Sequence, residues 1–599
     1  MIHLNDSMET KPFLNRNQIF LGLILVAAFT LRIWGIDFGL PHIYHTDEWF
    51  EVKRALKLGS GVFDFERVSK GGYFYLLFFE YGIYYVALKL FGVIKSADDF
   101  LFKVFQDPTN IWLIGRITTA VIGTLNCLFV YILGKHVHSK TVGLFAALFL
   151  AIHLIHVQSS HYITVDVPLT CLITICFLIM CLNISESKFN KFHYCMLAIF
   201  VALAVMTKIP GAVILFPVLI FHYRNIKSES SKVSLKSYLF DKRFLYFSLV
   251  FLIVYISGNP GIIIKLKSTI YWAFSFFNLS DTASVAPEFP QPNPPESFII
   301  YWLSILFPFK YMALNIFVWG GMVFSFKRMY LKHYLFLAFL IPYFFFLCSS
   351  KSIEHIYPRY ILPLTPILSI YGGIFIDYLS EKSVKRPYIK IIILALIIAA
   401  IFPVIKDTIA LDEDFTKLDT RTIAKVWVEE NIPNDSIIII QGSLYKASTL
   451  TVPLKIKADV VDQIMSEYIS KNEKSGEKGR FYEILKKSLN TQKTYHLILT
   501  GNNQQLLGAL NKGTINYIIL RDKTKRLLML ETNREIFPEL YGLTVWLDSD
   551  DFELIKIFEP TKKIVGPKLL IYKRSTKSST LNEKSVFKNN QPKQPNKPK

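Results

Sequence analysis

Cysteine is scarce in this chain, and its placement excludes several kinds of site. All six cysteines lie within or at the edges of apolar segments, so none can form a disulfide in the polar C-terminal region. No metal-type spacing of cysteine with histidine occurs, and packing is the role predicted for these side chains. The cysteines are Cys127, Cys171, Cys176, Cys181, Cys195 and Cys348.

Acidic residues are also few, because 67 Lys and Arg stand against 46 Asp and Glu, a formal charge of +21. In a soluble protein this charge would suggest nucleic-acid binding. Here much of the excess falls in short loops between apolar segments, as the positive-inside bias of membrane proteins predicts. We therefore expect membrane lipids, and no nucleic acid, among the partners. The first apolar stretch also lacks the small-residue cleavage site of a secretory signal, so we expect it to be retained.

Hydrophobic side chains are abundant: they make up 52% of the chain, with 50 Phe and 31 Tyr, and the mean hydropathy is +0.35. About 20 apolar residues cross a bilayer as a helix, and eleven segments qualify when loop charge is also considered. We expect a polytopic α-helical membrane protein with an N-terminus in the cytoplasm. The segments are 19–34, 111–133, 141–157, one descending from 166, two flanking 207–211, 244–264, 298–326, one ending at 348, 360–382 and 391–404.

The domain organisation follows from these segments. Residues 1–18 form a cytoplasmic N-terminus, and 19–405 form the transmembrane domain, with a long first outer loop at 37–110 that holds a helix-length patch at 73–91. Short apolar and alternating runs then predict an extracytoplasmic α/β domain at 406–575. Its expected strands are 436–440, 495–499, 516–520 and 569–572, and its expected helices are 420–430 and 480–489. The tail at 576–599 is rich in Lys, Asn, Gln and Pro and is expected to be disordered.

Candidate functional residues gather in four places on the outer side. Ionisable groups at a lipid boundary must be solvated, paired or used, and convergence of several loops on one face suggests an active site. Each residue also has a plainer interpretation: solvated loop carboxylates, a helix N-cap for Asp166, surface histidines, or an interfacial anchor for Arg359. Arg116, within an apolar stretch, needs a partner. The four groups are Asp47 and Glu48, which His42 and His45 flank; Asp64, Glu66 and Lys70; His161 and Asp166; and Glu354, His355, Arg359 and Tyr360.

Such a site suits group transfer from an anionic lipid. A carboxylate such as Asp47 could take a proton from an acceptor hydroxyl, while Arg or Lys side chains hold the departing phosphate. A lipid or solute transporter is the alternative, although no internal repeat of the kind common in transporters is visible.

Several motifs, in order, carry a family resemblance. His45-Thr46-Asp47-Glu48 is similar to a first-loop Asp-Glu motif, and Arg116 to Gly134 to a second-helix pattern. The others are His161 to Pro168, Lys208-Ile209-Pro210-Gly211, Pro358 to Pro363, and Asp419-Thr420-Arg421. In these the chain resembles the GT-C membrane glycosyltransferases that use polyprenyl-phosphate sugars, in the group of protein O-mannosyltransferases and lipid A aminoarabinose transferases.

The resemblance implies roles for individual residues. Asp47 would be the catalytic base or acceptor-binding carboxylate, with Glu48 beside it, and the donor phosphate would be held by Arg359, Lys208, Lys70 and Arg116. Binding or structural roles would fall to His45, His161, Asp166, Tyr360 and Glu66. Ser69-Lys70-Gly71-Gly72 departs from the prolines usual in the family. Some relatives hold a divalent metal through first-loop acids, for which Glu66 is the candidate here, and the cofactor is otherwise unknown.

We therefore expect a glycosyltransferase that moves a sugar, mannose or another hexose, from a polyprenyl-phosphate donor to a hydroxyl on a protein, lipid or glycan acceptor. A bacterial plasma membrane is preferred as its location, with an endoplasmic-reticulum membrane as the alternative.

Overall fold

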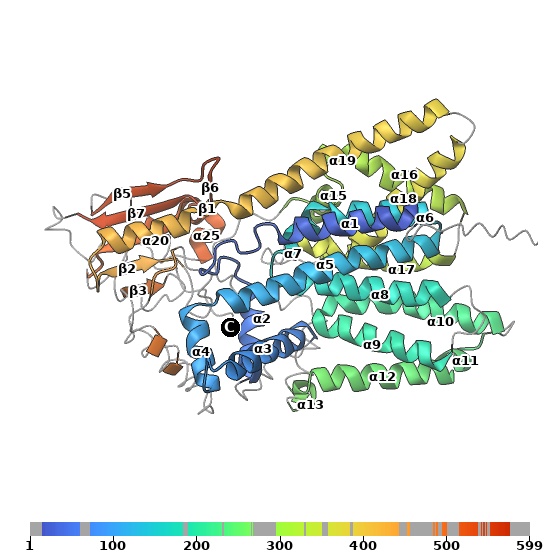
Figure 1. The fold of residues 1–599 in the computed structure, drawn as a ribbon, viewed down its shortest axis with the longest axis horizontal. Coiled ribbons are helices and arrows are strands. Elements are labelled where there is room, and N and C mark those ends of the chain that lie inside the picture. The colour runs from blue at the N-terminus through green and yellow to red at the C-terminus, as the bar shows by residue number, and fades with distance from the viewer. Residues whose placement is uncertain are drawn as a thin grey trace, which may run out of the picture.

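A bundle of helices and a smaller sheet domain form the two ends of the molecule, and the long helix α19 runs from one to the other (Figure 1). The computed structural model describes residues 15–59, 72–183, 190–229, 233–264, 266–267, 295–328, 331–349, 357–383, 387–441, 452–455, 483–484, 487–488, 494–499, 514–536, 541, 543–544, 547 and 551–575. The end of the bundle that carries α2–α4 and the sheet domain is called the outer end below.

The bundle is built from many helices, several of them interrupted. The first are α1 (Arg16–Ile33), α2 (Glu48–Gly59), α3 (Gly72–Leu90), α4 (Ala97–Gln106), α5 (Thr109–Val137), α6 (Lys140–Ala151), α7 (Leu154–Ser160), α8 (Asp166–Asn183) and α9 (Lys191–Thr207). The next are η1 (Ile209–Ile214), α10 (Leu215–Glu229), α11 (Leu235–Leu239), α12 (Lys242–Gly258), α13 (Gly261–Ile264), α15 (Phe298–Leu306), η3 (Phe309–Tyr311), α16 (Met312–Arg328), α17 (Leu331–Ser349), η5 (Pro358–Leu364), α18 (Thr365–Lys382) and α19 (Pro387–Thr416).

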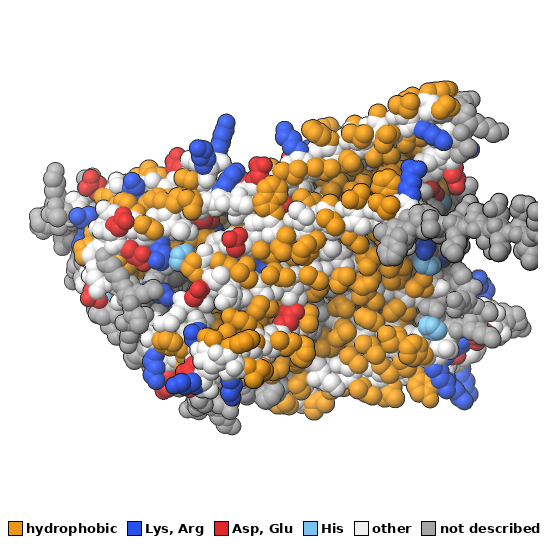
Figure 2. All heavy atoms as spheres, viewed as in Figure 1, with side chains coloured by type: hydrophobic (Ala, Val, Ile, Leu, Met, Phe, Trp, Pro, Cys, Tyr) orange, Lys and Arg blue, Asp and Glu red, His pale blue; other side chains and the backbone are white. Residues whose placement is uncertain are grey.

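Membrane-spanning length is reached by seven helical segments of the described chain, or by eight if the bent pair α6–α7 counts as one span. Helices α8 and α9 are apolar but shorter. The protein is therefore a multi-pass membrane protein, while the expected count of eleven spans stays a prediction. Hydrophobic side chains cover the visible face of the bundle, and charged ones gather on the sheet domain and at the opposite end (Figure 2).

Two of the expected spans are broken. The third was expected as one segment, but α6 and α7 meet at a 62° bend. Side chains of other helices bond the carbonyls at this bend: the Arg32 guanidinium donates to Leu150 O and Ala151 O at 3.1 and 3.0 Å, and Thr408 Oγ1 donates to Ile152 O at 3.0 Å. In the eighth segment, Pro308 lies at the break between α15 and η3.

The loop expected as the first outer loop contains α2, α3 and α4, and the helix expected at 73–91 is confirmed as α3. These helices share a core with the start of α5, in which Leu56, Leu77, Phe100 and Trp112 are buried. The loop therefore packs on the outer end of the bundle and does not hang free from it.

The sheet domain contains β1 (Leu418–Asp419), α20 (Thr420–Asn431), β2 (Ile437–Ile440), β3 (His496–Leu499), β4 (Tyr517–Arg521), α24 (Asp522–Leu528), α25 (Glu531–Ile536), β5 (Phe552–Phe558), β6 (Ile564–Val565) and β7 (Leu569–Arg574). Five strands form a mixed sheet in the order β3-β2-β4-β7-β5, and β1 pairs separately with β6. The central strand β2 is apolar throughout because side chains pack on both of its faces: Ile438 and Ile440 on one, Ile439 on the other.

The four expected strands correspond to β2, β3, β4 and β7, and the helix expected at 420–430 corresponds to α20. The last membrane helix was expected to end near 404, but α19 continues to Thr416, so the sheet domain starts about ten residues later than the expected boundary at 406. The helix expected at 480–489 and the tail at 576–599 fall largely or wholly outside the described residues.

Candidate active site

Asp47 lies at the outer end of the bundle, immediately before α2. Its carboxylate forms an ion pair with the Arg359 guanidinium, and its side chain remains 39% exposed. His45 Nε2 lies 3.5 Å from Arg359 Nη1, and the His45 ring stacks on Tyr162 with centroids 4.0 Å apart. Burial lowers the pKa of His45, so the neutral ring can accept a hydrogen bond from Arg359.

Asp166 connects Arg359 to a second cation. Its two carboxylate oxygens lie 3.2 Å from Arg359 Nε and 2.7 Å from Lys208 Nζ. The Lys208 ammonium also lies 4.0 Å from the centre of the Tyr360 ring. Asp47, Asp166, Lys208 and Arg359 therefore form one cluster, called the outer cluster below, in which two carboxylates balance two cations.

Helix ends place the members of the outer cluster. Asp166 is the first residue of α8, Lys208 follows the last residue of α9, and Arg359 is the second residue of the 3-10 helix η5. The turn after Lys208 requires glycine at position 211, since a Cβ there would lie 2.5 Å from the carbonyl oxygen of Ala204. This close approach explains the glycine in the Lys-Ile-Pro-Gly turn.

Glu48, the neighbour of Asp47, points into the protein instead. Its carboxylate is fully buried and accepts hydrogen bonds from Arg116 Nε at 2.8 Å, Arg116 Nη2 at 2.9 Å and the backbone N–H of Ile163 at 3.2 Å. Arg116 Nη1 donates to the carbonyls of Ile36 and Phe38 at 2.8 and 2.9 Å. The partner that Arg116 needs is therefore Glu48, and the pair fixes the first loop to α5.

His161 is also buried, away from the four residues of the outer cluster. Its Nε2 lies 3.0 Å from the carbonyl oxygen of Trp34 and 3.7 Å from Asp412, and its ring stacks on Phe415. Asp412, on α19, and Arg32, on α1, are fully buried ionisable residues that sequence reasoning missed. The signal for Arg32 is a guanidinium inside an apolar run, the same signal that drew attention to Arg116.

Several candidates fall outside the described residues: Asp64, Glu66, Lys70, Glu354 and His355. In the part of the chain that is described, no group of three His, Cys, Asp or Glu side chains could hold a metal ion. The hypothesis of a divalent metal, which named Glu66, therefore stays a prediction.

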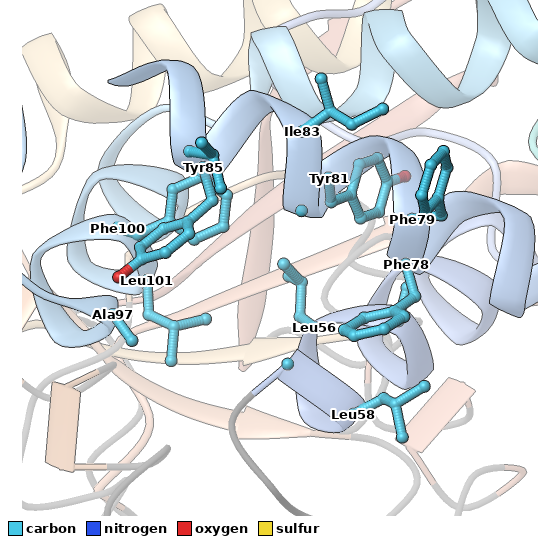
Figure 3. Close-up of a pocket in the computed structure, with 14 residues that line it drawn as sticks. Leu56, Leu58, Phe78, Phe79, Tyr81, Ile83, Tyr85, Ala97, Phe100 and Leu101 are labelled. Atoms are coloured by element: carbon cyan, nitrogen blue, oxygen red, sulfur yellow. The ribbon is translucent and has the colours of Figure 1, made fainter. Parts of the chain in front are cut away.

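A separate apolar cavity of about 580 Å³ lies between α2, α3 and α4 (Figure 3). Leu56, Phe78, Ile83 and Phe100 are among the side chains that line it, and none of its lining residues belongs to the outer cluster. Gly82 also lines it, and a Cβ at this position would meet no atom within 4 Å.

Comparison with known proteins gives one family match. Residues 99–257 match the model of the family described as dolichyl-phosphate-mannose-protein mannosyltransferase. A search of curated proteins found no match.

Among solved structures, the oligosaccharyltransferase AglB from Archaeoglobus fulgidus, in complex with an inhibitory peptide and a dolichol-phosphate, aligns with 94% of this chain and 75% of its own, at 12% identity and a TM-score of 0.48. ArnT from Cupriavidus metallidurans bound to undecaprenyl phosphate aligns with 92% of this chain and 97% of its own, at 13% identity and a TM-score of 0.44. The arabinofuranosyltransferase AftD from Mycobacteria aligns with 94% of this chain and 42% of its own, at 11% identity and a TM-score of 0.42.

The resemblance of this chain to membrane glycosyltransferases rests on the family match. Residues 99–257 contain three of the motifs quoted from the sequence: Arg116 to Gly134, His161 to Pro168, and Lys208 to Gly211. The match confirms the resemblance of this chain to the polyprenyl-phosphate-dependent membrane glycosyltransferases of the GT-C type, through the dolichyl-phosphate-mannose-protein mannosyltransferase family.

Proposed function

We propose that this protein transfers a sugar from a polyprenyl-phosphate donor to a hydroxyl acceptor, with the chemistry in the outer cluster. The observation that carries the proposal is the position of Asp47, a partly exposed carboxylate in contact with Arg359, which in turn shares Asp166 with Lys208. A base and two phosphate-binding cations thus lie together at one end of a membrane bundle, where a lipid-linked donor can enter from the side.

The carboxylate and the cations of the outer cluster act on different parts of the reaction. The acceptor hydroxyl gives its proton to Asp47 while its oxygen forms a bond to the anomeric carbon of the sugar. The bond between that carbon and the phosphate oxygen breaks, and the polyprenyl phosphate leaves with the electron pair. Arg359 and Lys208 stabilise the negative charge that develops on the phosphate.

Donor binding would also change the contacts of Asp47. The guanidinium of Arg359 is bound to both Asp47 and Asp166. A phosphate that engages Arg359 would displace Asp47 and add a nearby negative charge. The Asp47 carboxylate would then face the acceptor hydroxyl in place of Arg359.

The remaining predicted site residues are assigned supporting roles. Glu48 and Arg116 have buried, mutually satisfied side chains, so we assign them to holding the first loop in place of direct catalysis or phosphate binding. His161 contacts the carbonyl of Trp34 at the end of α1, just before this loop. His45 and Tyr360 contact the outer cluster and are placed to shape it.

The donor and the acceptor are proposed by chemistry. The matched family is named for mannose transfer from dolichyl phosphate to protein, so a polyprenyl-phosphate-linked hexose and a protein hydroxyl are the first pair to assay, followed by lipid and glycan acceptors. The charge of the loops supports an orientation with the outer end outside the cytoplasm, in a bacterial plasma membrane or facing the lumen of the endoplasmic reticulum.

The test measures label transfer from a panel of radiolabelled polyprenyl-phosphate sugars by purified protein in lipid nanodiscs. Asp47→Asn should lower the transfer rate about 10²- to 10⁴-fold, the range for removal of a general base. Asp37→Asn is the matched control, because Asp37 is an exposed carboxylate of the same loop. The transfer rate of this variant should equal that of the wild type. A folded Asp47→Asn variant with full activity would exclude the proposed role.

The transporter alternative gives a different outcome in the same material. It predicts no transfer from any donor, together with solute counterflow in reconstituted vesicles. The family match does not favour it.

A further inference from the structure

The sheet domain contacts residues 37–49, called the catalytic loop below, at Tyr44, three residues before Asp47. The hydroxyl of Tyr44 lies 2.6 Å from Thr422 Oγ1, and the guanidinium carbon of Arg421 lies 3.7 Å from the centre of the Tyr44 ring. A longer contact of 3.4 Å joins Arg421 Nη1 to the backbone carbonyl of Tyr44. These contacts connect residues almost 380 positions apart in the chain, so they form only when the sheet domain docks.

Arg421 and the start of α20, the helix that also carries Thr422, are themselves held in place. Asp419 caps the start of α20 and accepts hydrogen bonds from the Arg421 backbone N–H, Nε and Nη2 at 2.8, 2.8 and 2.7 Å. Thr420 Oγ1 donates to the carbonyl of Pro567 at 2.8 Å, and Asp419 pairs with Val565 in the short sheet of β1 and β6. The first turn of α20 is thus a rigid support.

Asp47 lies between two attachment points of the same loop. On one side Tyr44 is bound to the sheet domain, and on the other Glu48 is bound to Arg116 of the bundle. Burial raises the pKa of Tyr44 to about 12, so its hydroxyl keeps its proton and its hydrogen bond to Thr422 over the working range of pH. With both ends of Tyr44–Glu48 fixed, the intervening residues have little freedom to move Asp47 away from Arg359.

We propose that Arg421 and Thr422 are positioning residues, through which the sheet domain holds the catalytic loop and sets the place of Asp47. This inference rests on the proposed function for its kinetic consequence, but the mechanical part is independent of it. The sheet domain thereby takes part in the chemistry of the outer cluster without touching substrate.

Kinetic measurements on the full-length protein test the first consequence. Thr422→Val and Tyr44→Phe each remove one partner of the hydrogen bond and should lower kcat about three- to tenfold, the effect of one such bond. KM for the donor should stay within twofold, because Arg359 and Lys208 are untouched. The double variant should be no slower than the slower single variant, since both changes remove the same bond.

Val426→Thr, one turn further along α20, is the matched control. Val426 is 49% exposed, and the substitution makes the reverse exchange of methyl and hydroxyl, so kcat should not change. Arg421→Lys keeps a cation near the Tyr44 ring and should retain more activity than Arg421→Gln.

Hydrogen exchange gives a second measurement that needs no activity. Backbone amides of residues 37–49 should exchange faster in Thr422→Val than in the wild type, while those of α18 stay the same. If the wild type transfers no sugar but the loop loosens, the proposed function fails and the positioning role stands. Unchanged exchange and unchanged kcat in folded variants would overturn the inference, as would a rise in KM alone, which would assign the pair to substrate binding.

Discussion

Two adjacent acidic residues, Asp47 and Glu48, are predicted to respond in opposite ways to the same substitution. Glu48→Gln should destabilise the protein strongly, whereas Asp47→Asn should change its stability little and its activity greatly. The reason is burial: the Glu48 side chain is fully buried against Arg116, while that of Asp47 is 39% exposed beside Arg359.

The magnitude for Glu48 follows from its three contacts. The oxygen of a glutamine could still accept from Arg116 Nε and the Ile163 N–H, but its amide nitrogen would face Arg116 Nη2, one donor against another. Arg116 would then be a buried cation without a counter-charge, and removing one partner of a buried pair costs about 3–5 kcal/mol. The partly exposed pair of Asp47 contributes about 1 kcal/mol or less after solvent screening.

The assay is thermal unfolding in one detergent, followed by the loss of a monodisperse peak in gel filtration. Glu48→Gln should melt well below the wild type, and Asp47→Asn should melt close to it. Replacing both Glu48 and Arg116 by Met should not restore stability fully, because the carbonyls of Ile36 and Phe38 would lose their donor. If Glu48→Gln melts at the same temperature as the wild type, the structural role assigned to the pair of Glu48 and Arg116 is wrong.

Three further predictions concern other parts of the molecule. Arg359→Lys keeps a positive charge but loses the planar guanidinium that contacts both Asp47 and Asp166. In the transfer assay, kcat/KM for the donor should fall about 10- to 100-fold. An unchanged value would contradict phosphate binding by Arg359. Burial lowers the pKa of His42 to about 4, from 6.5 in the unfolded chain. The contribution of neutral His42 to the free energy of unfolding is therefore present above pH 6.5 and is lost as the pH falls towards 4. In His42→Gln the melting temperature should depend less on pH over this range than in the wild type. Gly82→Ala should stabilise α3 by up to about 1 kcal/mol, since its Cβ meets nothing within 4 Å. The control Gly115→Ala should destabilise α5, because its Cβ would lie 2.8 Å from Ile163. Equal melting temperatures for the two variants would contradict both packing arguments.

Local patterns in the sequence were sufficient for much of the architecture. A helix must be apolar over a minimum length to cross lipid, so the bundle could be predicted from composition alone. Strand β2 was visible as an apolar run of four isoleucines, and the turn at Lys208 as a helix interrupted by Pro and Gly. The family motifs also singled out Asp47 and Arg359, because adjacent carboxylates and a guanidinium at a lipid boundary are unusual.

Pairings between distant residues were decided by the tertiary structure. Glu48 and Asp47 are neighbours with the same chemistry, and only the packing of α5 sends one into the interior and leaves the other in the outer cluster. Likewise, nothing local to Tyr44 predicts its contact with Thr422, because their separation is 378 residues.

The sequence by itself determined which segments are apolar enough to form the bundle and which polar residues had to be explained. The tertiary structure decided which of those residues satisfy one another and which remain available for a substrate. The physical reason is that hydrophobic length and helix breaking are properties of a short segment, whereas the pairing of a buried charge depends on every helix packed around it.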